Sequence, residues 1–295
     1  MELNKTLLAA LVAPWLLAAS LPASAIIKWD SGNCTSSFQS TCGDANPVPA
    51  GSPTVTYSSI SDTGAGATLA SAYVVAYGTH LGITSRAGSN AAANGTAPYD
   101  STENAPGAQE TTTSPQHAMD NNGNSEFFLL SFSSSVSLSQ VELGWSDTDS
   151  DITVLAYKPT SGPANPTLAL TNGSTTYSLL TGLGWKLIGN YANVCSPNSC
   201  AVAPDSVAIN GGATPVSSSY WLIGAYNSTN FGTASDPNSS TSSLGTGNDY
   251  VKLLTVSGIS QPNTPPSSVP EPSSLWLAGL AMLGLTRARR RRAAQ

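Results

Sequence analysis

The sequence predicts an all-β protein, and three observations point to this class. Between Ile26 and Gly258, no long segment places apolar residues at the 3.6-residue spacing of an amphipathic helix. Short runs rich in Val, Ile, Tyr, Phe and Trp recur instead, separated by clusters of Ser, Thr, Asn, Gly and Pro. Hydrophobic residues make up 40% of the chain, which is enough to form a core, and the 9% of charged residues excludes a coiled coil or a charged disordered tail.

Nine runs carry the strand pattern. In chain order, the expected strands are Val55–Tyr57, Leu69–Tyr77, Glu126–Phe132, Val141–Trp145, Ile152–Tyr157, Trp185–Ile188, Ser206–Ile209, Tyr220–Tyr226 and Tyr250–Val256. Many short strands joined by turn-rich segments are typical of antiparallel sandwiches. We therefore expect a single antiparallel, jelly-roll-like β-sandwich over residues 26–257, flanked by an N-terminal signal peptide and a C-terminal hydrophobic helix.

The first 25 residues have the pattern of a secretory signal peptide. Lys5 supplies the basic start, an apolar run follows from Leu7 to Ala19, and Ala23 and Ala25 flank a serine in the small-residue pattern that signal peptidase cleaves. A buried core helix is the alternative interpretation of the apolar run. We expect signal peptidase to remove residues 1–25, so that export through the inner membrane leaves a mature chain beginning near Ile26.

The other end of the chain combines three features in a fixed order. The triplet Pro270, Glu271 and Pro272 precedes an apolar stretch from Ser274 to Leu285, and a basic cluster follows: Arg287, Arg289, Arg290, Arg291 and Arg292. At 1.5 Å per residue the apolar stretch measures roughly 18 Å, less than the ~30 Å hydrocarbon core of a bilayer, which predicts a weak membrane anchor. Because arginine-rich flanks stay in the cytoplasm, the cluster should stop transfer and leave the preceding domain on the far side of the membrane.

This order of triplet, apolar helix and arginine cluster resembles the PEP-CTERM sorting signal of Gram-negative bacteria. The resemblance assigns residues 270–295 to the sorting signal. Residues 258–269 are rich in proline and serine, and this composition predicts an extended linker. It implies recognition by exosortase, an integral-membrane cysteine protease that removes the tail after a transient stay in the inner membrane. The protein then passes to the cell surface or extracellular matrix. A C-terminal anchor that is never processed is the alternative.

The charge of the expected mature domain argues against a nucleic-acid partner. Residues 26–270 contain five Lys or Arg and 15 Asp or Glu, which gives a net charge of −10. Such a domain repels nucleic acid and anionic lipid headgroups. An exported chain also does not meet the genome, so the arginine cluster is not interpreted as a nucleic-acid patch.

Four cysteines in an exported chain predict disulfides. Their close spacing favours two local loops, Cys34 with Cys42 and Cys195 with Cys200, among the three possible pairings. Zinc is the alternative ligand for cysteines. Neither pair has the Cys-x-x-Cys spacing and the chain contains only two histidines, which disfavours a zinc site.

Asp147, Asp149 and Asp151 are the candidate ligands of a metal ion. On an extended backbone, residues two apart point to one face, so three like charges would gather there. Calcium takes carboxylate, carbonyl and amide oxygens, and if it binds we expect further ligands from a neighbouring strand end: Asp120, Asn122 and Glu126. Neither acidic stretch has the EF-hand pattern, and a solvated acidic turn is the alternative. No other cofactor is expected.

The acidic stretch also carries a second resemblance. With Gly144 and Trp145 before it and Ile152–Tyr157 after it, it is similar to a subfamily of exosortase-dependent surface proteins. Further fragments fit the same subfamily: Leu81–Arg86, Tyr220–Ala225 and Asp249–Leu254. Together they span most of the mature chain. The resemblance implies a location and no established activity.

No catalytic residues are expected. Ser114 and His117 are close in sequence, but the chain lacks a Gly-x-Ser-x-Gly elbow. Glu126 and Glu142 are the candidate glycosidase pair, and their separation in space does not follow from the sequence. We predict a non-enzymatic surface or matrix protein, associated with biofilm or exopolysaccharide.

Two other functions stay open. One is a calcium-dependent polysaccharide-binding module, in which Trp145, Trp185 or Trp221 stacks on sugar rings; core packing is the alternative for these side chains. The other is a secreted hydrolase, which requires a cleft with paired carboxylates or a serine in contact with a histidine.

Overall fold

The computed structural model describes residues 25–32, 34, 38–85, 117–160, 165–195, 200, 204–232, 236–240 and 243–260. Nearly all of the predicted signal peptide, most of the predicted linker and the whole predicted sorting signal lie outside these residues. Among the residues that the structure describes, no helix is both long enough and apolar enough to span a bilayer.

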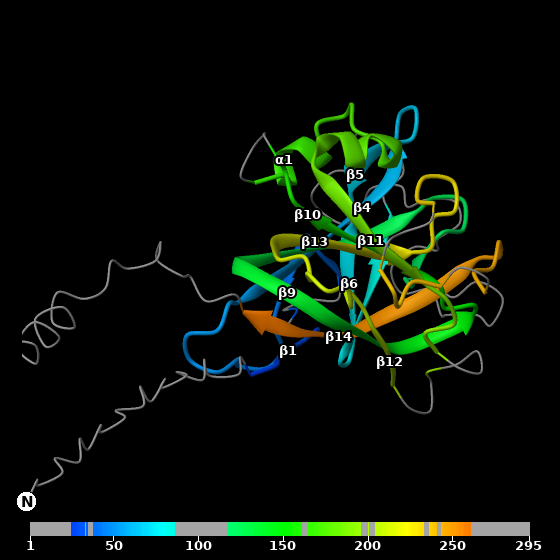
Figure 1. Ribbon diagram of the computed structural model, residues 1–295. Coiled ribbons are helices and arrows are strands. Elements are labelled where there is room, and N and C mark those ends of the chain that lie inside the picture. The colour runs from blue at the N-terminus through cyan, green and yellow to red at the C-terminus, as the bar shows by residue number, and fades with distance from the viewer. Residues whose placement is uncertain are drawn as a thin grey trace, which may run out of the picture.

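The described chain is all-β, which confirms the predicted class (Figure 1). Its strands are β1 (Ile27–Asp30), β2 (Phe38–Gln39), β3 (Thr41–Gly43), β4 (Val55–Gly64), β5 (Thr68–Ser71), β6 (Tyr73–Tyr77), β7 (His80–Thr84), β8 (Met119–Asp120), β9 (Glu126–Thr148), β10 (Ile152–Tyr157), β11 (Trp185–Tyr191), β12 (Asp205–Ala208), β13 (Ser218–Ala225) and β14 (Asp249–Ser260). Two short helical segments, α1 (Thr167–Leu170) and the 3₁₀ helix η1 (Tyr177–Leu183), lie between β10 and β11. The named strands pair antiparallel throughout.

The long strand β9 organises the sheet, whose order is β11-β10-β13-β9-β14-β7-β6-β2. The first half of β9, residues 126–132, lies between β4 and β13, whereas its second half, residues 136–148, lies between β12 and β14. Figure 1 shows β9 crossing the width of the domain. Because the partners change along one strand, a single hydrogen-bonded sheet folds over on itself and encloses a core between its two halves.

The two halves of the sheet share one main core. Phe128 and Leu130 from the first half of β9 join Val141 and Leu143 from the second half in the same buried cluster. Trp29 of β1 packs edge-on against Phe132, with ring centroids 4.9 Å apart. Burying side chains of this size contributes on the order of 1.5–3 kcal/mol each, so this cluster is the main source of stability.

The part of the sheet around residues 126–132 of β9 is buried on both faces. Alternate residues of a strand point to opposite sides, so Phe127 and Leu129 leave the main core and enter a second cluster. Tyr177 and Leu180 of η1 cover that cluster. Two buried faces explain why this part of the sequence reads as continuous apolar runs rather than as an alternating pattern.

Some of the predicted strands are joined or divided in the structure. Glu126–Phe132 and Val141–Trp145 are parts of the one strand β9, because the serine-rich residues between them also find ladder partners, such as Val136 opposite Ser218 and Ser260. The predicted strand Leu69–Tyr77 is instead divided into β5 and β6. The division falls at Ala72, whose backbone N–H donates to the carbonyl of Ser59 in β4.

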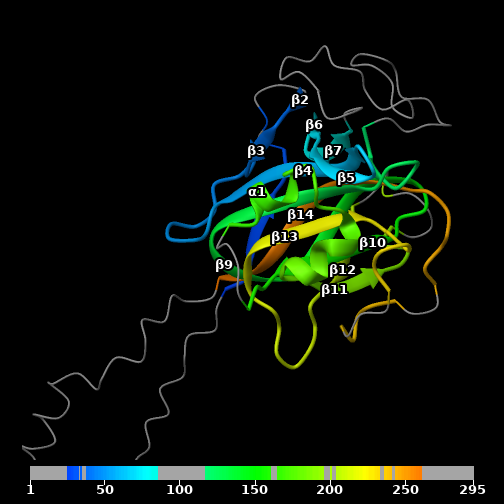
Figure 2. The same ribbon diagram turned by 90° about the horizontal axis from the view of Figure 1, so that it is seen from above.

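The ends of the described domain lie side by side. β1 pairs with the end of β14, with Ile27 opposite Gly258, and β14 continues to Ser260 within the segment predicted as a linker. Asp249 begins β14 at its other end. The first and last strands therefore meet at one end of the domain, and the loop before Asp249 lies at the other end of β14 (Figures 1 and 2).

Both predicted disulfides are confirmed. Cys34 is joined to Cys42, and Cys195 is joined to Cys200. All four thiols are used in these bonds, so no cysteine is free to bind zinc. The bonds close loops of eight and five residues, which makes them local clips.

Candidate functional site

Three aspartates from loops far apart in the sequence meet at one end of the domain. Asp149 and Asp151 lie in the loop between β9 and β10, and Asp249 begins β14. One carboxylate oxygen from each lies within 4.8 Å of the other two. An isolated bridge between the backbones of Asp149 and Asp249 holds the loop against the strand. We call these three residues the carboxylate cluster.

Asp249 is the central member of the cluster. Its side chain is buried, and its Oδ1 accepts a hydrogen bond of 2.9 Å from the backbone N–H of Asp151. Its Oδ2 accepts one of 2.8 Å from the amide Nδ2 of Asn121, while its own N–H donates to the Oδ1 of that amide. The Asn121 side chain thus pairs with both the backbone and the carboxylate of Asp249, which fixes the direction of the carboxylate.

Asp151 is held in a similar way from two other loops. Its Oδ1 accepts a 2.8 Å hydrogen bond from the backbone N–H of Asn193, and its Oδ2 accepts one of 2.6 Å from the backbone N–H of Gly245. Asp149 is half-buried, and its Oδ1 accepts from the N–H of Ser150. Each carboxylate therefore has fixed donors, and the three still face one another.

Burial and mutual repulsion shift the titration of the cluster. Burial raises the pKa of Asp249 to about 8, and the charges of Asp151 and Asp149 act in the same direction, against the hydrogen bonds that lower it. Burial also raises the pKa of Asp151 to about 6, with Asp149 adding to the shift. Carboxylates this close relieve their repulsion in one of two ways, by retaining a proton or by binding a cation.

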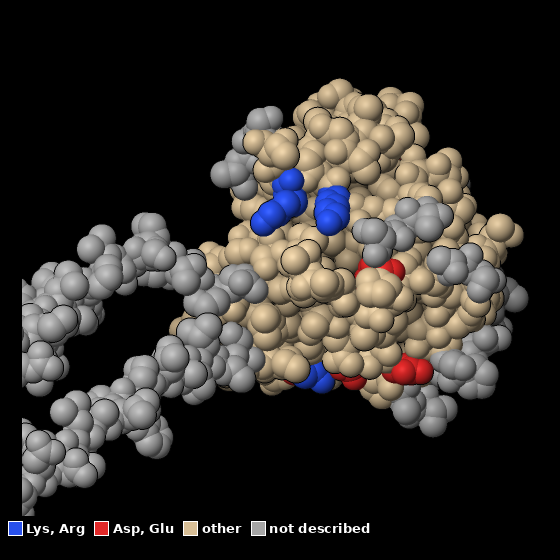
Figure 3. Space-filling model, in the orientation of Figure 1, with Lys and Arg blue, Asp and Glu red and all other residues tan. Residues whose placement is uncertain are grey.

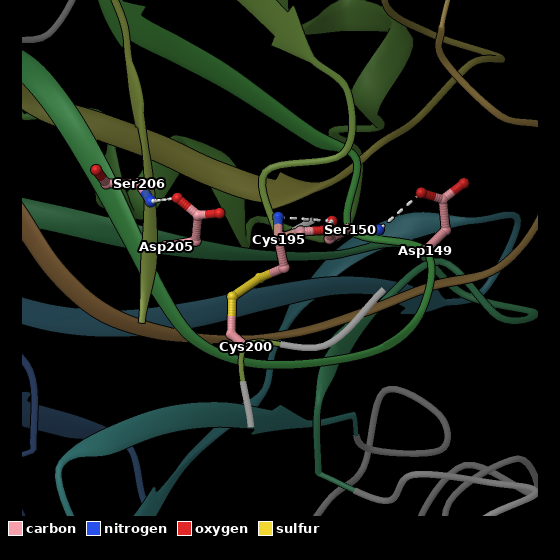
Figure 4. The surroundings of a disulfide bond; sticks show 6 residues. All are labelled: Asp149, Ser150, Cys195, Cys200, Asp205 and Ser206. Atoms are coloured by element: carbon pink, nitrogen blue, oxygen red, sulfur yellow. Dashed lines mark hydrogen bonds between the residues drawn. A yellow bond between two sulfur atoms is a disulfide. The ribbon is translucent and has the colours of Figure 1, made fainter. Parts of the chain in front are cut away.

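The local disulfide braces the loop that carries the cluster. Ser150, between two of the aspartates, accepts a 2.9 Å hydrogen bond at its Oγ from the N–H of Cys195. Figure 4 shows Asp149 and Ser150 on the loop that passes the Cys195–Cys200 bond. The disulfide-bonded Cys195 is therefore hydrogen-bonded to the segment that carries Asp149 and Asp151.

The structure brings together two of the three aspartates predicted as metal ligands. Asp147 lies outside the cluster, and its Oδ1 accepts from the N–H of Thr148. Thr148 has a φ of 58°, in the left-handed region, so the backbone is not extended between Asp147 and Asp149. The alternation assumed from the spacing therefore ends at this residue.

The other predicted ligands contact different groups. The Oδ1 of Asp120 accepts from the N–H of Asn122 at 2.8 Å. Glu126 is buried and accepts from the N–H of Asp120 at 3.2 Å and from the hydroxyl of Ser85. None of these three belongs to the carboxylate cluster.

Asp249 is the site residue that sequence reasoning missed. It lies 98 residues after Asp151, so no local spacing connects them. A usable signal was its position at the start of a predicted strand, the same position that Asp151 has before β10. When the ends of several strands lie at the same end of a β-domain, residues at those strand ends come close together.

The candidate catalytic and sugar-stacking residues are dispersed. Glu126 and Glu142 lie in different halves of β9, and Glu142 pairs with Lys28 at 3.2 Å. His117 is buried with its Nδ1 2.5 Å from the hydroxyl of Thr84, and Ser114 is outside the described residues.

The three tryptophans have different surroundings. Trp185 and Trp221 are buried in the two hydrophobic clusters, which is the structural role that the sequence left open. Trp145 is half-buried, and the ammonium of Lys252 lies 4.5 Å from the centre of its ring.

Comparison with known proteins identifies the end of the chain. Residues 268–292 match the family model described as the PEP-CTERM protein-sorting motif. The chain carries a PEP-CTERM motif. This confirms the resemblance seen at Pro270, Glu271 and Pro272, and the motif marks an exported protein that exosortase targets to the surface. Neither the curated proteins nor the solved structures gave a match, so the function of the β-domain is interpreted from its own geometry.

Proposed function

We propose that this PEP-CTERM protein is a non-enzymatic component of the cell surface or biofilm matrix of a Gram-negative bacterium. Signal peptidase and exosortase act on it during export, the inner membrane holds it transiently, and extracellular polysaccharide surrounds it afterwards. The observation that carries the proposal is a sorting motif following a braced β-domain with two disulfides. Disulfides persist in the oxidising environment outside the cytoplasm.

The surroundings of the candidate catalytic groups support a role without catalysis. Glu126 accepts hydrogen bonds inside the domain, whereas Glu142 forms an ion pair on another stretch of the strand. A glycosidase needs its two carboxyl groups roughly 5–9.5 Å apart across a substrate. His117 is buried and bonded to Thr84, which leaves its Nδ1 engaged.

Intact-mass analysis of the protein from its host, with and without exosortase, tests the proposal. We expect a surface form that begins near Ile26, ends near Pro270–Pro272 and lacks Arg287–Gln295. Glu271→Ala should leave the protein in the inner membrane, whereas the control Asp205→Ala, which removes an exposed carboxylate from β12, should be sorted normally. A full-length tail on the surface form would contradict the proposal.

A calcium-dependent polysaccharide-binding module is the second candidate, and the carboxylate cluster favours it. Asp149, Asp151 and Asp249 offer the hard oxygen ligands that calcium prefers, already oriented by fixed donors. Retention of the protein on extracellular polysaccharide, with release by a chelator, would support this function. Retention that a chelator leaves unchanged would show that polysaccharide binding does not depend on calcium.

A further inference from the structure

A small polar cavity lies next to the carboxylate cluster. It has a volume of about 140 Å³, and its walls come from the loops after β8, after β13 and before β14. Asn121 connects the two features, since it lines the cavity and also holds Asp249. Loops gathered at one end of a rigid β-scaffold are a common place for a binding site.

Amide side chains form a rigid frame around this cavity. The Nδ2 of Asn121 donates to the carbonyl of Tyr226 at 2.8 Å, which ties two of the loops together. The Nδ2 of Asn227, a buried residue, donates to the hydroxyl of Ser125 at 2.9 Å, and its Oδ1 accepts from Asn230. The cavity walls are therefore set by hydrogen bonds within the protein.

Several hydroxyl groups that line the cavity can bind a ligand, because the hydrogen bonds of the frame do not use them. Tyr226, Ser228, Thr229 and Thr246 line the cavity, and none of their hydroxyls has a hydrogen-bond partner among the described residues. Tyr226 is half-buried, and the lining of the cavity as a whole is predominantly polar. A hydroxyl both donates and accepts, which suits a ligand whose own groups are hydroxyls.

The charges around the cavity select against an anionic ligand. No Asp, Glu, Lys or Arg lines it, and Asp151 and Asp249 lie directly behind two of its walls, bonded to Gly245 and Asn121. Figure 3 shows one face of the molecule, on which charged side chains are few. A uronate or sulfate group would meet the negative cluster without a cation to pair with it.

The volume limits the ligand to a small unit. At ~30 Å³ per water molecule, the cavity holds about five waters, far less than the roughly 300–1,000 Å³ of a pocket for a drug-sized molecule. This space admits only part of a sugar ring, which would enter edge-on from a longer chain. Its hydroxyls would meet those of the walls.

We propose that this cavity binds one neutral sugar unit of an extracellular glycan. The inference rests on the proposed function, because it requires the domain to be exported into a matrix that contains glycans. It assigns Tyr226 and Thr246 as binding residues and the Asn121 amide as the positioning residue of the cavity.

Affinity electrophoresis of the exported protein, in gels that contain a polymer, tests the proposal. The probes are dextran and galactomannan, which are neutral, and alginate, which is a polyuronate. We expect retardation by a neutral polymer and none by alginate. Tyr226→Phe and Thr246→Val each remove one hydroxyl and should weaken the retardation about three- to tenfold, as expected for one net hydrogen bond.

Two matched variants serve as controls. Tyr220→Phe removes a hydroxyl from β13, outside the cavity lining, and Thr214→Val removes one from a separate cavity beside Lys186. Both should leave the retardation unchanged, and melting curves should show that all four variants are folded.

Three results would overturn the proposal: no retardation by either neutral polymer, retardation by alginate alone, or equal effects of the cavity variants and the controls. Intact-mass analysis of the same sample keeps the two proposals distinguishable. A correctly processed chain that no neutral polymer retards would refute the sugar site and leave the sorting function standing.

Discussion

The carboxylate cluster predicts that the domain loses stability as the pH rises from 6 to 8 in the presence of a chelator. Burial raises the pKa of Asp249 from 3.8 to about 8, so the folded chain keeps a proton that the unfolded chain has released. The stability from this proton is complete below pH 4 and is lost as the pH passes 8. For one such group, the loss between pH 6 and pH 8 is about 2 kcal/mol.

Urea unfolding at pH 6, 7 and 8 measures this loss directly, since the free energy of unfolding extrapolates linearly to zero denaturant. Asp249→Asn places a neutral amide at the same position and should flatten the pH dependence. The control Asp205→Asn, on the exposed strand β12, should retain it. Equal stability of the parent protein at pH 6 and pH 8, or the same loss in Asp249→Asn, would refute the reasoning.

Three other predictions concern stability. If the carboxylate cluster binds calcium, a hundredfold excess of calcium over Kd at pH 8 should raise the free energy of unfolding by about 2.7 kcal/mol. Asp151→Asn should remove this gain. Coincident unfolding curves with and without calcium would show that the cluster binds no calcium and relieves its repulsion by retaining a proton. Replacing Cys195 and Cys200 with alanine should cost about 2 kcal/mol in urea unfolding, because the closed loop is short, and an unchanged midpoint would contradict this. Gly82→Ala should lower the melting temperature by several degrees, because the new Cβ would lie 1.6 Å from the carbonyl oxygen of His117. A melting temperature equal to that of the parent would show that the backbone at His117 moves aside without cost.

The sequence predicts the fold best where burial is strongest. β10 has the predicted bounds Ile152–Tyr157, because all its residues are buried and the apolar run ends where the burial ends. β2 and β8 have two residues each and form only because longer strands lie beside them, β6 and β14. No local pattern encodes a strand whose existence depends on a distant neighbour.

The candidate site was predictable only in part, for a related reason. Asp149 and Asp151 carry a local signal, but the left-handed backbone at Thr148 turns Asp147 out of the set. Asp249 enters the cluster through the pairing of β14 with β9, a contact across the fold. The sorting motif needed no such information, because its recognition depends on a contiguous stretch of sequence.

The direction of β14 determines what the domain presents while its tail is still attached. The strand starts at Asp249 and ends at Ser260, eleven residues further on and roughly 36 Å away along an extended strand, on the side from which the chain continues to the sorting motif. The described chain therefore ends at the opposite end of β14 from the carboxylate cluster and the polar cavity. Neither feature lies at the point where the described part of the chain ends.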